Sequence, residues 1–197
     1  MIAVNSDFSD LDGTCCYCSA ESAGRIRTSI AALPLRALHL LGTGDYHYVS
    51  LFYLERVSEP FQLLLFDNHP DDQPCAFGGD LLSCGSWVAD AVKLPELRTV
   101  SHIRNSGDLK SLAEDGLPVY LSIDLDVLSE VYVRTNWDQG TMRLDELLAL
   151  LGRVASCRRI IGADLCGGIT IPQGASAHDL TLNGRVYDAV SEFFAAL

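Results

Sequence analysis

Two stretches of the chain end in ligand-type side chains at every second position: Leu-Phe-Asp-Asn-His-Pro-Asp at residues 65–71 and Tyr-Leu-Ser-Ile-Asp-Leu-Asp at residues 120–126. Side chains of a strand alternate between its two faces, so Asp67, His69 and Asp71 are expected to point the same way. Asp124 and Asp126 share a face for the same reason. Because ligands bind at the carboxyl ends of the strands in parallel α/β sheets, the two stretches predict one shared site.

The predicted site is most simply a metal centre, because its clustered carboxylates would otherwise repel one another. Carboxylates and imidazoles suit manganese, whereas thiolates would have suited zinc better. The alternative is a polar strand end without metal. A lone Asp-x-Asp is common in loops, but Asp-x-His-x-Asp directly after the apolar run 61–66 is much rarer. The sequence therefore favours a site for two metal ions.

Length and composition predict one domain, residues 1–197, with a sizeable core. Of the 197 residues, 48% are hydrophobic. Fourteen basic and 26 acidic residues give a net charge of −12, which argues against nucleic acid and membrane surfaces as partners. The sequence has no apolar run of about 18 residues and no signal-peptide pattern at its start. We expect a cytoplasmic protein with a small-molecule substrate, and homo-oligomer formation stays open.

The seven cysteines are scattered except for Cys15, Cys16 and Cys18. An odd, scattered set fits reduced thiols better than a disulfide framework. A zinc or iron–sulfur site would need a second cluster with ligand spacing, which the sequence lacks. The N-terminal trio is interpreted as structural, with a redox or substrate-contact role as the alternative. The remaining four cysteines are isolated in the sequence: Cys75, Cys84, Cys157 and Cys166.

Strands and helices are predicted to alternate along the chain. Apolar runs predict strands over residues 2–4, 35–41, 61–66, 99–103, 119–123 and 159–163. Spacing and capping residues predict helices over residues 19 or 22 to 33, 47–57, 86–93, 144–154, and 177 or 179 to 196. Alternation of this kind is typical of a three-layer α-β-α domain with a mostly parallel central sheet. Long loops at 70–83 and 128–142 follow the metal-motif strands, where long loops are usually functional.

A third motif, Gly-Thr-Gly-Asp-Tyr-His at residues 42–47, follows the predicted second strand. His47 alone would be interpreted as a solvent-facing residue at a helix start, but beside the other motifs it becomes a sixth candidate ligand. In this order, the three motifs resemble the metal signatures of the arginase/agmatinase (ureohydrolase) superfamily. The first signature here carries an extra residue, Tyr46, before the histidine. The resemblance covers roughly residues 35–170 and implies a trimmed version of the ureohydrolase fold.

The resemblance implies a binuclear manganese site, with two Mn²⁺ ions per chain. It assigns His47 to one ion and His69 to the other, with Asp67 and Asp124 bridging both. Asp71 and Asp126 would complete the coordination. Two metal ions about 3.5–4 Å apart can share a water molecule, lower its pKa and direct it at an electrophilic carbon bonded to nitrogen.

The sequence also departs from the superfamily. Gly167 stands where members that cleave guanidines carry a glutamate, and Cys84 stands where they carry a histidine before a glycine. His102, at the end of a predicted strand, is either a replacement acid/base or a buried structural histidine. Asp164 would contact a substrate cation, orient a neighbour or cap a turn. The candidate catalytic residues are Asp126, Cys84 and His102.

These residues predict a manganese-dependent hydrolase of a linear C–N bond in an amide, amidine or modified guanidine, and not a standard arginase. The main alternative is a metal-binding or regulatory module of reduced activity on the same fold. A two-metal phosphoesterase is disfavoured, because only Arg104 and Arg134 are candidates for binding phosphate. An open polar cavity over the metals would favour an enzyme, and a capped site would favour the module.

Overall fold

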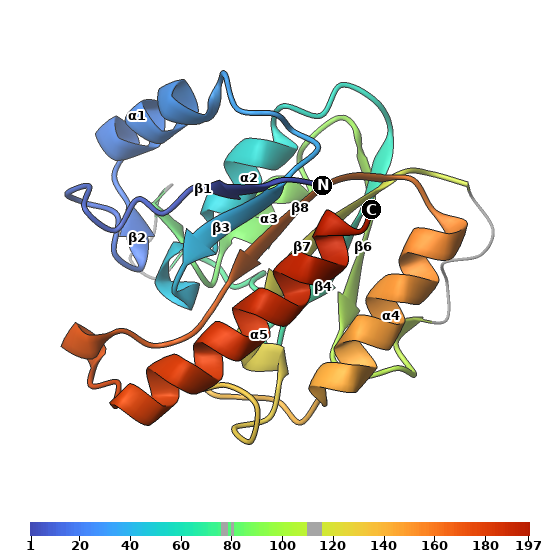
Figure 1. The fold of residues 1–197 in the computed structure, drawn as a ribbon. Coiled ribbons are helices and arrows are strands. Elements are labelled where there is room, and N and C mark those ends of the chain that lie inside the picture. Colours follow the sequence, from blue (N-terminus) through green and yellow to red (C-terminus); the bar gives the residue numbers. More distant parts are fainter. Residues whose placement is uncertain (76–78, 80, 110–115) are drawn as a thin grey trace.

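A computed structural model describes residues 1–75, 79, 81–109 and 116–197 and contains a six-stranded sheet between layers of helices (Figure 1). In spatial order the strands are β1 (Ala3–Asn5), β3 (Leu38–Gly42), β8 (Ile160–Cys166), β7 (Val119–Asp124), β4 (Phe61–Phe66) and β6 (Leu97–Ile103). Each neighbouring pair is parallel. The predicted three-layer α/β class with a mostly parallel sheet is confirmed.

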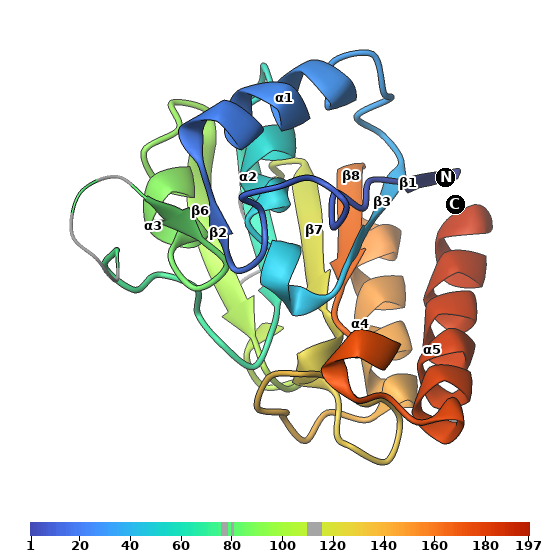
Figure 2. The same ribbon diagram turned by 90° about the vertical axis from the view of Figure 1, so that its left-hand side faces the viewer.

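The helices divide between the two faces of the sheet (Figure 2). On one face lie α1 (Ala20–Ile30), α2 (Val49–Leu54) and α3 (Trp87–Ala91), and on the other α4 (Leu144–Cys157) and α5 (Ala177–Ala195). Alternate residues of β4 supply both cores: Leu63 and Leu65 pack toward α1–α3, while Leu64 and Phe66 pack toward α4 and α5. Burial on both faces explains why β4 is apolar at every position except Gln62, whose amide donates a hydrogen bond to Ser101.

Several predicted boundaries are wrong. The helix expected over 47–57 is shorter, because Gly44–Tyr46 form a tight 3₁₀ turn and α2 begins at Val49. The predicted loop 70–83 ends in β5 (Leu82–Ser83), which pairs antiparallel with β2 (Tyr17–Cys18). Two-residue strands are too short to show a period, so the sequence does not reveal them. Residues 76–78 and 80 of that loop lie outside the described residues.

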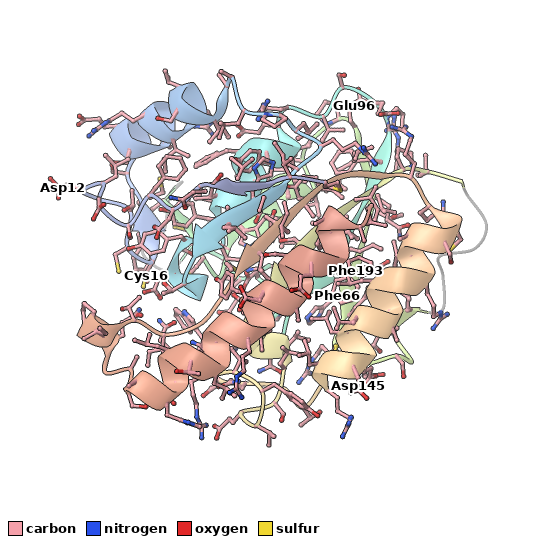
Figure 3. All side chains as sticks on the ribbon, viewed as in Figure 1. Asp12, Cys16, Phe66, Glu96, Asp145 and Phe193 are labelled. Atoms are coloured by element: carbon pink, nitrogen blue, oxygen red, sulfur yellow. The ribbon has the colours of Figure 1, made fainter. Side chains whose placement is uncertain are left out.

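The four central strands of the sheet are β3, β8, β7 and β4, and their carboxyl ends lie next to one another along the same edge. The segments that carry the three sequence motifs leave the sheet at this edge. Figure 3 shows Cys16 beyond the carboxyl end of β3, on the same side of the molecule. None of the described helices is both long and apolar enough to cross a membrane.

Candidate metal centre

The six predicted ligands converge at this edge of the sheet. Nδ1 of His47 lies 3.1 Å from Oδ2 of Asp67, 3.0 Å from Oδ2 of Asp71 and 3.6 Å from Oδ2 of Asp124. Nδ1 of His69 lies 2.8 Å from Oδ2 of Asp126 and 3.6 Å from Oδ1 of Asp67. His47 is only 1% exposed, so its interpretation as a solvent-facing residue is wrong.

The ligand atoms form overlapping groups, each small enough to surround one ion. His47, Asp67 and Asp71 form one group, and Asp67, His69 and Asp126 form another. Asp67 belongs to both, and its buried Oδ2 accepts no hydrogen bond among the described residues. A buried carboxylate oxygen without a hydrogen bond is costly unless a cation satisfies it. The residues present therefore fit a divalent ion on each side of Asp67.

Backbone N–H groups hold three of the carboxylates in place. Oδ1 of Asp124 accepts a hydrogen bond from the N–H of Asp126 at 2.9 Å, and Oδ1 of Asp126 accepts one from Asn68 at 3.0 Å. Oδ1 of Asp67 accepts one from the N–H of His69 at 2.6 Å. Asp67 and Asp124 are thus oriented by their own turns and Asp126 by the turn after β4, and the second oxygen of each is directed toward the cluster.

Two glycines leave room for Asp124. A Cβ atom on Gly167 would lie 2.6 Å from Oδ1 of Asp124 and 2.7 Å from the nitrogen of Leu125. One on Gly44 would lie 2.9 Å from Oδ2 of Asp124. Gly167 also has a φ of +101°, which disfavours any other residue. No side chain, including a glutamate, fits at position 167 without displacing Asp124.

Burial and mutual repulsion set the protonation of the carboxylates. Burial, together with the charge of Asp67, raises the pKa of Asp124 to about 6. Burial also disfavours the charge of Asp67, but the neighbouring imidazoles of His47 and His69 and the N–H of His69 outweigh burial and lower the pKa of Asp67 to about 2. The hydrogen bond to Asp126 raises the pKa of His69. Burial and the charge of Asp124 raise the pKa of Asp126. Without metal, protons partly neutralise the cluster.

This protonation predicts a pH dependence of the metal-free protein. Protonated His69 stabilises the fold through its contact with Asp126. This contribution is complete below about pH 6.5 and is lost as the pH rises through the folded-state pKa of His69, about 10. Because the His69 side chain is 35% exposed, we expect a loss on the order of 1 kcal/mol, or about 2–4 °C in Tm. Thermal unfolding in chelator across this range measures the effect. His69→Asn should flatten the profile, and an equal slope in the variant would contradict the assignment.

A buried hydrogen-bonded chain orients His47 from behind. Nε2 of His47 lies 2.8 Å from Oγ of Ser122, which donates at 2.8 Å to Oδ1 of Asp164. Asp164 is fully buried within β8, so its interpretation as a turn cap is wrong and its orienting role is supported. The sequence analysis missed Ser122. Its position two residues before Asp124, and therefore on the same face of β7, was the available signal.

Breaking this chain should weaken metal binding without removing a ligand. We expect Ser122→Ala to lower Mn²⁺ affinity by roughly 10–100-fold, because the tautomer and ring orientation of His47 are no longer fixed. Titration calorimetry with Mn²⁺ measures the change. Ser156→Ala, at an exposed position on α4, serves as the control. Equal affinity in Ser122→Ala and wild type would show that His47 needs no such support.

Trp87 is a second supporting residue that the sequence analysis missed. It is fully buried at the start of α3, and its Nε1 donates a hydrogen bond at 2.7 Å to Oδ2 of Asp71. Asp71 has a φ of +48°, a conformation that aspartate tolerates better than most residues. The indole of Trp87 thus holds the carboxylate of Asp71 beside His47.

A cavity of about 320 Å³ opens over the cluster. Its walls include Cys16, Tyr17, Cys84 and Trp137, and no lysine or arginine among the described residues. The predicted catalytic Cys84 lies in this wall, where burial and the charge of Asp71 raise its thiol pKa to about 12. His102 is not part of the wall. Its Nε2 lies 2.7 Å from the carbonyl oxygen of Asp67 and holds that backbone.

Asp45 ties together the segments around the cavity mouth. Its Oδ1 accepts hydrogen bonds from Nδ2 of Asn136 at 2.8 Å and Nε1 of Trp137 at 3.0 Å. Its Oδ2 accepts one from Nε2 of Gln173 at 2.9 Å. The long loop at 128–142 and the segment after β8 are thereby fixed to the turn that carries His47. The sequence analysis included Asp45 in the motif at residues 42–47 but gave it no role.

Comparison with known sequences identifies a relative of this chain. No protein-family model matches the chain. An uncharacterized protein from Thermotoga maritima is 35% identical over 143 residues, which are 64% of this chain and 56% of that protein. The chain thus spans little more than half the length of this curated relative.

Solved structures of ureohydrolases share the architecture. A hypothetical agmatinase from Burkholderia thailandensis superposes with a TM-score of 0.62 and 20% identity, over 91% of this chain and 67% of that one. For an arginase from Medicago truncatula the TM-score is 0.64 and the identity 20%, over 90% of this chain and 66% of that one. For a formimidoylglutamase from Bacillus subtilis the TM-score is 0.64 and the identity 14%, over 88% of this chain and 66% of that one. The chain therefore has the α/β fold of the arginase/agmatinase (ureohydrolase) superfamily, as its three motifs predicted.

Proposed function

We propose that the protein is a binuclear metal-dependent hydrolase of a linear C–N bond in a small amide, amidine or modified guanidine. The carrying observation is the convergence of two histidines and four aspartates around Asp67, whose buried Oδ2 accepts no hydrogen bond from the described residues. The shared fold and the open cavity support the same proposal. Oxygen and nitrogen donors of this kind favour Mn²⁺.

The position of each residue in the cluster suggests its role in the proposed reaction. Asp67 lies between His47 and His69, one on each side of it, while Asp124 lies beside His47. Divalent ions bound there would supply a water-derived nucleophile at neutral pH and polarise the substrate. Asp126 both faces His69 and lines the cavity, so it is the proposed group for holding a proton during the reaction. Cys84 forms part of the cavity wall, and its thiol stays neutral there.

Two alternatives are less well supported. A phosphoesterase would need cations that face the substrate, but Arg104 and Arg134 lie outside the lining of the cavity, which contains no lysine or arginine among the described residues. A non-catalytic metal-binding module would suit a capped site, whereas this cavity is open and His69 is 35% exposed at its side chain.

Cytoplasmic location stays part of the proposal, and the absence of disulfides among the described cysteines supports a reducing compartment.

Metal content tests the proposal directly. When manganese is the only transition metal supplied, we expect two divalent ions per chain, because four clustered carboxylates need that charge. Elemental analysis of the desalted protein measures the ratio, and a panel of amides, amidines and guanidines assayed for ammonia or urea release tests turnover. A folded sample that retains no metal after reconstitution would remove the basis of the proposal. Two ions without any turnover would favour the non-catalytic module.

A further inference from the structure

We propose that Cys166 supplies a sulfur ligand to the ion on the His47 side, so that this position takes a borderline-soft ion such as Zn²⁺ or Co²⁺ ahead of Mn²⁺. The inference rests on the proposed metal centre and adds to it a seventh ligand and a difference between the two positions. The sequence analysis treated Cys166 as isolated, and none of the three motifs contains it.

The register of the sheet brings Cys166 to the cluster. It is the last residue of β8, the strand between β3 and β7, where it pairs with Gly42 on one side and Asp124 on the other. Its side chain is fully buried, and its Sγ lies 3.1 Å from Oδ2 of Asp124. Ligand atoms of His47, Asp124 and Cys166 all lie within 4.8 Å of one another.

Two of the separations among these atoms match those between neighbouring ligands of one metal ion. Bond lengths of about 2.3 Å to sulfur and about 2.0 Å to oxygen or nitrogen place neighbouring ligand atoms about 3.3–3.5 Å apart. The observed separations are 3.1 Å from Sγ of Cys166 to Oδ2 of Asp124 and 3.6 Å from that oxygen to Nδ1 of His47. These two separations are within a few tenths of an ångström of the expected values, and the sulfur lies within 4.8 Å of a ring nitrogen of His47, so the three groups can share one ion.

The same geometry would also suit a thiol that only donates a hydrogen bond to Asp124. The two roles differ in where the proton is. As a ligand, the sulfur loses its proton to the buffer and gives an electron pair to the ion, with no change in oxidation state. Sulfur ligation would favour Zn²⁺ and Co²⁺ over Mn²⁺ on the His47 side. The His69 side, with Asp67 and Asp126, offers only nitrogen and oxygen.

Cobalt titration of the metal-free protein separates these roles. Visible d–d bands report bound Co²⁺, whereas a near-ultraviolet sulfur-to-cobalt charge-transfer band appears only if a thiolate is a ligand. We expect both in wild type and in Cys18→Ser, a control at a buried cysteine of β2. Cys166→Ser should keep the visible bands and lose the charge-transfer band. Competition should show the variant's preference for Zn²⁺ over Mn²⁺ reduced by roughly tenfold or more.

The outcomes distinguish this inference from the proposed function. Visible bands without a charge-transfer band in wild type would overturn sulfur ligation and leave the metal centre intact. A charge-transfer band that persists in Cys166→Ser and disappears in Cys84→Ser would also overturn it. Folded wild type that binds no cobalt, zinc or manganese would overturn the metal centre itself. If the variant fails to fold, X-ray absorption of the zinc-loaded wild type decides, because a sulfur neighbour at about 2.3 Å is either present or absent.

Discussion

The manganese-loaded protein is expected to release urea from arginine and agmatine only near the limit of detection. Gly167 offers no carboxylate to a guanidinium, and losing one well-placed charged contact costs about 2–4 kcal/mol, or roughly 30- to 1000-fold in rate. The raised pKa of Cys84, about 12, leaves its thiol neutral and unable to replace an imidazole as a proton shuttle. Losing that help removes a further factor of roughly 10²–10⁴.

A urea assay with both substrates, run beside the amide and amidine panel, checks this expectation. Gly167→Glu is the informative variant, because it adds the missing carboxylate. We expect it to lose metal binding and to gain no activity, since its Cβ would lie 2.6 Å from Oδ1 of Asp124 on a backbone with a φ of +101°. Arginine turnover at ordinary enzyme rates in wild type would show that Gly167 and Cys84 are not the positions that decide guanidine cleavage.

Asp124→Asn is expected to abolish most of the stabilisation that metal gives to the fold. A ligand that binds only the folded state stabilises it by about 2.7 kcal/mol at a hundredfold excess over Kd. The variant loses a charged ligand beside His47, so this gain should largely disappear. Urea unfolding with and without Mn²⁺ measures it, and Asp188→Asn, at an exposed position on α5, is the matched control.

The metal-free behaviour of Asp124→Asn separates ligation from structural damage. Burial and the charge of Asp67 raise the pKa of Asp124 to about 6, so its ionised form costs stability above that pH. In chelator at pH 8, the variant should therefore be as stable as wild type or more stable. A metal-dependent gain equal to that of wild type would show that Asp124 holds no metal, and a large loss in chelator would indicate a structural role.

Local patterns in the sequence determined the strands and the predicted ligands. The largely apolar run located β4 at Phe61–Phe66, and alternation with period two placed Asp67, His69 and Asp71 toward one cluster. The leucine spacing after Arg143 located the start of α4, although this helix continues to Cys157 and not only to residue 154. These features depend on neighbours within a few residues, which is why periodicity is sufficient to find them.

Only the tertiary structure decided which other side chains support or surround the cluster. Ser122 meets Asp164, and Cys166 meets Asp124, because β8 inserts between β3 and β7 in the sheet. Asp45 binds Trp137 and Gln173, which come from segments far along the chain. Each of these contacts depends on strand order and register, and these follow from how the two cores pack against the sheet. A short-range pattern carries no information about that packing, so the sequence alone left Cys166 isolated and gave Asp45 no role.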